Sequence, residues 1–442
     1  MKFSRNAAAI SVLITLSVAP RMAHSQTRQS SRRRVVTAAS AQEQLLHNLL
    51  VQAKAAADKN DYATAAVDYE KYLAQKPDDA AAHFDLGYVY TAQAEKDKAI
   101  AEYRKAIALD PKMVQAYLNL GISLLGDDAK AAIAPLQKAA ALNYGYAQGH
   151  YLLGTAEDRA GQSQNALKEY TIAVRLDPND YASHMALARA ELTAGNAGAA
   201  EREFREALKL KANDKEAELG LAQSLIGEKK AADAAAALDD YLRQNPDDVK
   251  ARVTRASLLT QLGKDDEALA ELDRASKSGT ESLEALKLRA TIYYGKRDFA
   301  NAAAVLQKAS AIAPQDADIR AKLGHALLEN KDYAGAAREL NEAFRLDSST
   351  NDTLRDLVAA EYLSKNYPAT LEALDLLDQR EPPKPGAWFV RAMCYDHMGQ
   401  SKAALDGYQK FLAMNTDQTS NEYFEATGRV RFLERVVKEK GH

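Results

Sequence analysis

The sequence predicts an all-α protein, a solenoid of about eleven stacked helical hairpins within residues 43–416 that ends in one capping helix. Three observations carry this prediction. Ala, Leu, Glu, Lys and Asp dominate the 442 residues, whereas Gly is sparse and the β-branched residues are too scattered for many strands. Prolines recur at multiples of about 34 residues. Small residues recur at two places in almost every such period. Length alone would suggest roughly three globular domains, but a chain with this periodicity is better explained as one solenoid.

The N-terminal residues have the pattern of a secretory signal peptide. Two basic residues precede an apolar run at 7–19, and small residues follow at 23–25. A membrane anchor is the alternative, but a run of 13 residues falls short of the roughly 20 that span a bilayer. Initiation at Met22 would remove the signal. We therefore expect residues 1–25 to be a signal peptide and the protein to be exported, periplasmic or secreted.

The next segment, 26–42, is polar, rich in Ser and without periodicity, so we expect a flexible basic linker. Its arginine triplet at 32–34 is either a contact for anionic lipid or polysaccharide, or part of a solvated tether. Seven basic residues and no acidic ones precede Glu43, which leaves 51 basic against 61 acidic residues, a net charge of about −10, for the rest. A body of that sign is not suited to coat nucleic acid.

The prolines measure the repeat. Pro77 and Pro111 lie 34 residues apart, and steps of 68 residues link Pro178, Pro246, Pro314 and Pro382. The step from Pro111 to Pro178 is 67, so the third unit lacks one residue, which we expect to be missing between its two helices. Pro135 falls within the second helix of that unit, where the missing amide donor predicts a kink or a late helix start.

Two positions recur with small residues in almost every unit. The later position holds Ala65, Ala99, Ala132, Ala166, Ala200, Ala234, Ala268, Ala302, Ala336 and Ala404, with Thr370 as the one substitution. The earlier position holds Ala53, Gly87, Gly121, Gly154, Ala188, Ala222, Ala256, Ala290, Gly324 and Ala392, and only Val358 departs. Two small side chains let a pair of helices cross with axes about 8 Å apart, so each unit is predicted to be a helical hairpin.

These positions resemble the tetratricopeptide repeat (TPR), whose pattern W-x2-L-G-x2-Y, A-x3-F and P has a period of about 34 residues. The pattern is met at His83, Leu86, Gly87, Tyr90, Ala99, Tyr103 and Pro111, and again at Trp388, Ala392, Tyr395, Ala404 and Tyr408. The resemblance, to an exported bacterial type, implies a right-handed α-solenoid whose concave face, lined by the first helices, holds peptide segments or partner proteins. Arg255, Arg289 and Arg391 replace the family's Leu, and we expect structural roles for them.

Candidate contacts lie on the inward positions of the first helices. Those of the second to fourth units present a possible apolar patch: Phe84, Tyr88, Leu118, Asn119, Ile122 and Tyr151. Packing between hairpins is the alternative for some of them. Farther along, inward positions turn polar, and Arg189, Lys287 and Arg355 are candidates to receive acidic side chains or a C-terminal carboxylate, with scattered surface charge as the alternative. Leu118 and Ile122 occupy places where the family's known carboxylate clamp would need polar groups.

No motif for catalysis, a cofactor or a metal is found in the sequence. A Gly-rich phosphate loop, paired metal-ligating histidines and a nucleophile elbow are all missing, and Cys394 is the one cysteine. His83, His150 and His184 stand at equivalent repeat positions, so the repeat accounts for their spacing, and we expect packing roles. We therefore expect a non-enzymatic protein without a cofactor.

The last residues, 417–442, break the repeat and suit one amphipathic capping helix. Its inward side chains are expected to be Phe424, Val430, Phe432, Leu433 and Val436. The function expected from shape is a non-catalytic exported scaffold that binds protein or peptide partners along its concave face. A self-associating structural component of a cell-envelope assembly, or of polysaccharide or secretion machinery, is the alternative. We expect no nucleic-acid partner and no stable membrane span after signal removal.

Overall fold

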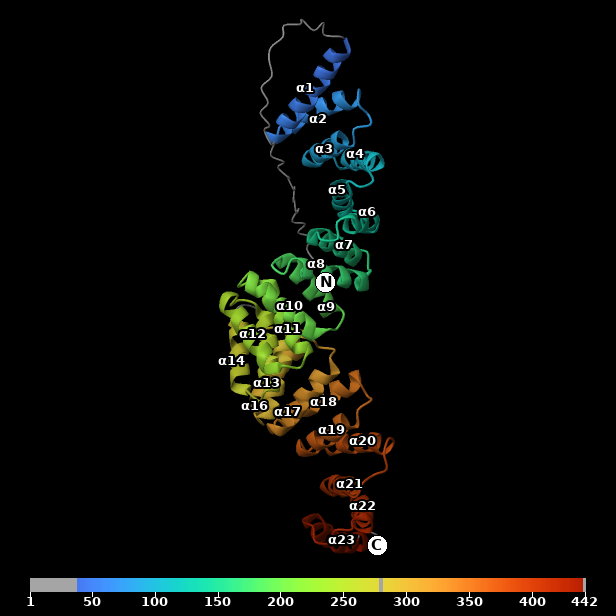
Figure 1. Ribbon diagram of the computed structural model, residues 1–442. Coiled ribbons are helices and arrows are strands. Elements are labelled where there is room, and N and C mark those ends of the chain that lie inside the picture. Colours follow the sequence, from blue (N-terminus) through green and yellow to red (C-terminus); the bar gives the residue numbers. More distant parts are fainter. Residues whose placement is uncertain (1–37, 278–280, 440–442) are drawn as a thin grey trace. The chain divides into compact units, whose positions relative to one another are not determined.

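The computed structural model describes residues 38–277 and 281–439 of the chain (Figure 1). Within these ranges 23 α-helices follow one another, without a strand. They pair as eleven hairpins, from α1–α2 to α21–α22, with the pair α5–α6 marked by the close approach of Gly121 to Leu136, and α23 follows the last hairpin. The expected α-solenoid of about eleven hairpins with a capping helix is therefore confirmed. The predicted signal peptide and most of the predicted linker lie outside the described residues.

The first helix of each hairpin has about 13 residues in most cases. These helices are α1 (Ala38–Asp58), α3 (Ala80–Ala92), α5 (Val114–Leu125), α7 (Ala147–Arg159), α9 (Tyr181–Thr193), α11 (Lys215–Gly227), α13 (Val249–Gln261), α15 (Leu283–Gly295), α17 (Ala317–Glu329), α19 (Asn351–Leu363) and α21 (Pro385–His397). The described residues form two compact units, one before and one after the boundary between Asn119 and Leu120, which falls within α5. They are called the units 1–119 and 120–442. Each unit is described by itself below.

The second helices pack against the first helices of the same hairpins. They are α2 (Tyr62–Leu73), α4 (Lys96–Leu109), α6 (Ala129–Leu142), α8 (Ser163–Leu176), α10 (Ala197–Leu210), α12 (Ala231–Gln244), α14 (Asp265–Lys277), α16 (Phe299–Ile312), α18 (Tyr333–Leu346), α20 (Tyr367–Asp378) and α22 (Ser401–Met414). The final helix is α23 (Asn421–Glu439).

Many first helices begin at an aspartate that closely follows one of the periodic prolines. The carboxylate of Asp79 accepts a hydrogen bond from the amide of Ala82 at 3.0 Å, and that of Asp248 accepts one from Ala251 at 2.9 Å. Such a side chain satisfies an amide that the first helical turn leaves without a partner. The proline thus ends one hairpin, and the aspartate two residues later starts the next.

The small-residue positions are the places where two helices of one hairpin cross. A Cβ at Gly87 would lie 2.7 Å from the ring of Tyr103, and one at Gly154 would lie 2.8 Å from the ring of Tyr170. The later position is buried in all eleven hairpins. A larger side chain at either position would force the helices apart, so the period in the sequence follows from the crossing geometry.

The structure tests three local predictions. Helix α1 begins at Ala38, so the last residues of the segment expected to be a flexible linker are helical, and that boundary is wrong. The residue missing from the third unit is lost where α5 ends and the turn begins, as expected, because the turns of the other ten hairpins hold a residue with positive φ, such as Ala94 and Gly161, and the turn 126–128 holds none. Helix α6 begins at Ala129 and continues through Pro135, so the late start, one of the two expected outcomes, does not occur.

The capping helix is present, but its buried face differs from the expected one. Ala426 and Leu433 are buried and Val430 packs against them, a spacing of four and three residues that defines one helix face. Phe424 and Phe432, which we expected to face inward, are 65% and 48% exposed. They lie off that face, so this part of the prediction is wrong. None of the described helices is long and apolar enough to cross a membrane.

Candidate functional site

Within the unit 120–442 the first helices of neighbouring hairpins approach one another. Contacts join α9 to α11, α13 to α15 and α17 to α19, whereas no two second helices in the described ranges meet to a similar extent. Hairpins that touch through their first helices and diverge at their second helices leave a groove along the first helices. The residues that line this groove are therefore the candidates for contact with another molecule.

A cavity of about 720 Å³ opens along α15, α17 and α19. Its apolar lining comes from Ala290 on α15, Leu306 on α16, and Ile319 and Ala321 on α17. The volume lies within the range of roughly 300 to 1,000 Å³ that is usual for ligand-binding clefts. The cavity can accept side chains of a bound segment, and its apolar lining favours at least one apolar group.

One wall of the cavity is a fixed cluster of rings. The rings of Tyr294 and His325 stack with centroids 6.0 Å apart, and Phe299 meets His325 edge-on at 6.3 Å. The Tyr294 hydroxyl donates a hydrogen bond to the carbonyl oxygen of Lys322, and burial raises the pKa of this phenol. His325 Nδ1 lies 2.9 Å from an oxygen of Asp356. These contacts hold the wall in place before any ligand arrives.

Charged side chains surround the opening, and acids outnumber bases. The lining acids are Asp318, Asp347, Asp352 and Asp356, and the lining lysines are Lys287 and Lys322. Both ammonium groups are already paired, Lys287 with Asp316 at 2.9 Å and Lys322 with Asp318 at 2.7 Å. The carboxylate of Asp316 holds the pKa of Lys287 above its ordinary value, so this lysine stays charged. The cavity therefore presents a net negative rim.

Of the three cations predicted to receive an acidic ligand, only Lys287 lines the cavity. Each of the three is paired with a carboxylate from the following hairpin. Arg189 meets Glu216 at 2.6 Å, and Arg355 meets Glu381 at 2.8 Å and its own neighbour Asp352 at 2.5 Å. These cations link successive hairpins, so an acidic ligand would have to displace a carboxylate that is already bound.

The six predicted apolar contacts do not line this cavity. In the unit 1–119, Leu118 is only 7% exposed, so it packs in the core and is not available for binding. Phe84 packs at 5.9 Å from the ring of Tyr103, and Tyr88 is half-buried. Asn119 hydrogen-bonds the Tyr103 hydroxyl and opposes the burial that raises the pKa of that phenol to about 12.

The remaining two candidates lie in the unit 120–442. Ile122 is half-buried, and the ring of Tyr151 packs 6.2 Å from that of Tyr170. Packing between and within hairpins thus takes up the surface of Leu118 and part of the surface of Phe84, Tyr88, Ile122 and Tyr151. What remains exposed of Phe84, Tyr88 and Tyr151 stays a predicted contact surface.

The three equivalent histidines have structural partners. Nδ1 of His83, His150 and His184 lies 2.5, 2.6 and 2.7 Å from a glutamate oxygen on the second helix of the same hairpin: Glu102, Glu169 and Glu203. Nε2 of each ring lies 3.0 to 3.1 Å from the backbone carbonyl six residues earlier. Arg252 and Arg320 repeat the arrangement with Glu271 and Glu339 at 2.7 Å. In the described ranges no His, Cys, Asp or Glu cluster could hold a metal ion.

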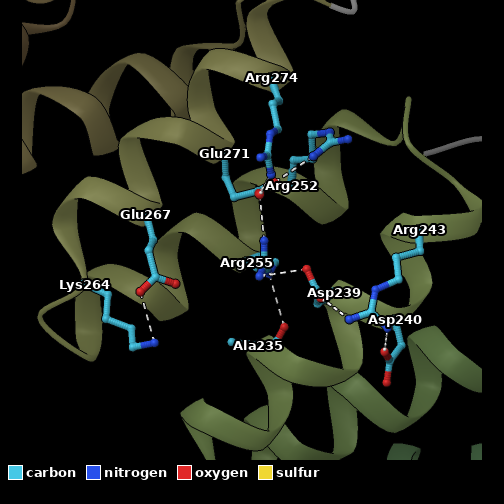
Figure 2. Close-up of polar contacts among 10 residues, drawn as sticks. All are labelled: Ala235, Asp239, Asp240, Arg243, Arg252, Arg255, Lys264, Glu267, Glu271 and Arg274. Atoms are coloured by element: carbon cyan, nitrogen blue, oxygen red, sulfur yellow. Dashed lines mark hydrogen bonds and ion pairs between the residues drawn. The ribbon is translucent and has the colours of Figure 1, made fainter.

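The arginine version of this contact forms a charge cluster around the buried Glu271 (Figure 2). Glu271 is 2% exposed and accepts hydrogen bonds from Arg252 at 2.7 Å, Arg255 at 2.6 Å and Arg274 at 2.6 Å. Arg255 also reaches Asp239 at 2.8 Å. Arg289 pairs in the same way with Asp273 on the preceding second helix, and Arg391 with Asp375. The structural role expected for these arginines is confirmed.

Sequence reasoning missed the acidic partners, although constant spacings mark them. The glutamate lies 19 residues after the histidine or arginine in all five cases. The aspartate lies 16 residues before the arginine at Arg255, Arg289 and Arg391. The spacing of 19 is set by the crossing of the two helices of one hairpin, and the spacing of 16 by the contact of a first helix with the second helix of the preceding hairpin. Each acid–base pair therefore recurs with the repeat.

Two family models, both described as tetratricopeptide repeat, match the chain. One covers residues 50–114 and 151–215, and the other covers 225–292 and 293–360, together more than half of the chain. A curated relative, the Protein CTR9 homolog of Arabidopsis thaliana, is 36% identical over 75 residues, which are 17% of this chain and 7% of the relative. The match thus spans a small part of that relative's length.

Several solved structures are similar in fold. A crystal structure of a MamA protein is 26% identical, with 38% of this chain and 93% of that chain covered at a TM-score of 0.37. The structure of Pseudomonas aeruginosa pilF is 20% identical, with 48% and 97% covered at 0.37. Yeast Tom70 is 13% identical, with 90% and 97% covered at 0.32. Superpositions this loose carry no inference about function.

Proposed function

Because the chain belongs to the tetratricopeptide repeat family, we propose that it is a non-catalytic scaffold that binds segments of partner proteins in the groove of α15, α17 and α19. The observation that carries the proposal is the cavity of about 720 Å³ that opens along these first helices. The family membership supports a protein-interaction scaffold in general, and the cavity supports this particular place on it.

Two properties of the cavity would favour binding: its accessible apolar surface and the fixed position of its aromatic wall. An apolar side chain of the segment would leave water for the half-buried Ala321 and Tyr294, which line the cavity, at a gain of about 25 cal/mol per Å² of apolar surface buried. Hydrogen bonds and stacking already hold the rings of Tyr294 and His325 in place. Binding therefore costs little side-chain conformational entropy at this wall. No reacting group is required for this role.

The proposal can be tested with random short peptides displayed as a library and selected on the mature chain. Ala321→Trp would fill the cavity and should weaken the selected peptides at least about tenfold, or about 1.4 kcal/mol. Gln307→Trp is the matched control, because Gln307 is exposed on α16 and does not line the cavity. Equal affinities for the two variants, with both folded by circular dichroism, would place the binding elsewhere and refute the proposal.

We also propose export, supported by the basic, apolar and small-residue order of residues 1–25. Fractionation of a bacterial host that expresses the full chain, with N-terminal sequencing of the product, tests this. The expected product is a chain that begins at Gln26 outside the cytoplasm. A cytoplasmic product that keeps Met1 would refute it.

The alternative of a self-associating structural component is favoured by one observation, the exposed rings of Phe424 and Phe432 on the capping helix. Light scattering of the mature chain separates the two functions. A monomer at low micromolar concentration supports the scaffold, whereas a stable oligomer that dissociates in Phe424→Ser with Phe432→Ser supports self-association.

A further inference from the structure

We propose that the groove of α15, α17 and α19 selects basic protein segments, in which a lysine or arginine stands beside an apolar residue. The proposal rests on the proposed function, since it names the partner chemistry for the same groove. Two independent features of the cavity lead to it: which charges on its rim lack a counter-charge, and where its apolar lining lies relative to them.

The lysines that line the cavity have ion-pair partners, whereas not all of the aspartates do. The lining lysines are both neutralised by aspartates at 2.7 to 2.9 Å. Asp347, in contrast, is in no ion pair within the residues that the structure describes. Its oxygen accepts the amide of Ser349 at 2.8 Å, and this bond holds the pKa of the carboxyl below its usual value, so it is ionised near neutral pH. Asp356 has His325 as its ion-pair partner, at 2.9 Å, and a histidine is charged only when protonated.

Accessible apolar surface lies within reach of these carboxylates, because the half-buried Ala321 and Tyr294 share the cavity with Asp347 and Asp356. Lysine and arginine side chains have an apolar stem and a charged head, and they place the stem on apolar surface while the head stays near water or a counter-charge. A cavity with an apolar lining and an acidic rim matches that construction. An apolar residue next to the lysine or arginine would fill the part of the cavity that the stem of the basic side chain does not occupy.

An acidic segment, which the sequence alone suggested, meets the opposite conditions. It would face Asp347 and Asp356 as like charges, and its carboxylate would have to replace Asp316 on Lys287. Like-charge contacts at an interface oppose binding and serve to exclude wrong partners. The rim therefore discriminates by charge, in favour of the basic partner.

The test uses three labelled peptides of equal length that differ only in the residues flanking a central leucine: Lys-Leu-Lys, Gln-Leu-Gln and Glu-Leu-Glu in a Gly-Ser frame. Fluorescence anisotropy with the full mature chain should show the lysine peptide binding roughly tenfold more tightly than the glutamine peptide, and the glutamate peptide most weakly. The preference should shrink as salt is raised, since partly exposed charges are screened.

Asp347→Asn with Asp356→Asn keeps an acceptor oxygen at each position and removes two charges. We expect the ratio of the lysine-peptide affinity to the glutamine-peptide affinity to fall roughly fivefold or more in this variant. Asp247→Asn, an exposed aspartate outside the cavity, is the matched control and should change neither affinity.

The outcomes separate this inference from the proposed function. Equal binding of the lysine and glutamine peptides, blocked by Ala321→Trp, overturns the preference for bases and leaves the groove function standing. No binding by these peptides or by library-selected ones overturns both. Tighter binding of the lysine peptide after substitution of Arg32, Arg33 and Arg34 would mean that the chain's own basic segment occupies the groove, which overturns the assignment to a partner.

Discussion

Glu271→Gln tests the buried charge cluster. The substitution keeps the size and one acceptor oxygen of the side chain but removes the charge that Arg252, Arg255 and Arg274 share at 2.6 to 2.7 Å. Removing one partner of a buried ion pair costs about 3 to 5 kcal/mol, because the other charge stays buried without compensation. Arg252 keeps the carbonyl of Pro246 at 2.8 Å and Arg255 keeps Asp239 at 2.8 Å. We therefore expect the lower end of that range, about 3 kcal/mol.

Glu339→Gln is the matched control. Glu339 stands at the same repeat position but meets one arginine, Arg320, at 2.7 Å, and the two side chains are 26% and 19% exposed, compared with 2% for Glu271. Solvent screens this pair, so its loss should cost about 1 kcal/mol. The contrast between the two variants isolates burial and the number of arginines from the substitution itself.

Hydrogen exchange of backbone amides is the suitable assay, because a repeat array need not unfold in one step and a local opening energy is required. Glu271→Gln should speed exchange in α13 and α14 by about 100-fold, the equivalent of about 3 kcal/mol, and leave α21 and α22 unchanged. A slowing of exchange, or an effect no larger than that of Glu339→Gln, would refute the view that this cluster holds its hairpin together.

Three further predictions address pH, packing and thiol accessibility. Burial raises the pKa of Glu157 to about 7, so between the unfolded value near 4.3 and pH 7 the unfolded chain releases a proton that the folded chain keeps, and stability falls as pH rises. Glu157→Gln should match the wild type in urea denaturation near pH 4 and exceed it by about 2 kcal/mol near pH 8; a larger gain at pH 4 would contradict this. Gly220→Ala places a Cβ 2.2 Å from the ring of buried Phe204 and should cost about 1 to 3 kcal/mol, whereas Gly295→Ala, with nothing within 4 Å, should not destabilise. The thiol of Cys394 is buried and its pKa is raised to about 11, so an aromatic disulfide reagent should label it slowly until urea is added; rapid labelling of the native chain would be inconsistent with this packing.

The hairpins were predictable because every repeat needs small residues at the place where its two helices cross. Gly87 is small where the ring of Tyr103 arrives, and the same need recurs at Gly154 with Tyr170, so the sequence repeats what the geometry demands. The capping helix lies outside the repeat, so no periodic position indicates which of its faces is buried. Its amphipathic pattern predicted a helix, but the orientation that exposes Phe424 and buries Ala426 depends on packing against α22.

The binding site was less predictable, because it depends on distances between hairpins. The sequence placed Lys287 on an inward position, but its partner Asp316 lies 29 residues away in the next hairpin. Nothing in the local pattern indicates that, of the acids that line the cavity, Asp347 is in no ion pair within the described residues. The periodic sequence pattern also cannot predict the cavity, because the volume of the cavity depends on the distance between α17 and α19.

Photo-cross-linking of the lysine peptide tests the central claim most directly. A benzophenone side chain at Ala321, in the groove of the first helices, should form the cross-link, and the same group at Gln307 on α16 should not. Cross-linking from Ala321 that is competed away by unlabelled lysine peptide is the result that we predict. Equal cross-linking from both positions, or cross-linking from Gln307 alone, would contradict the account.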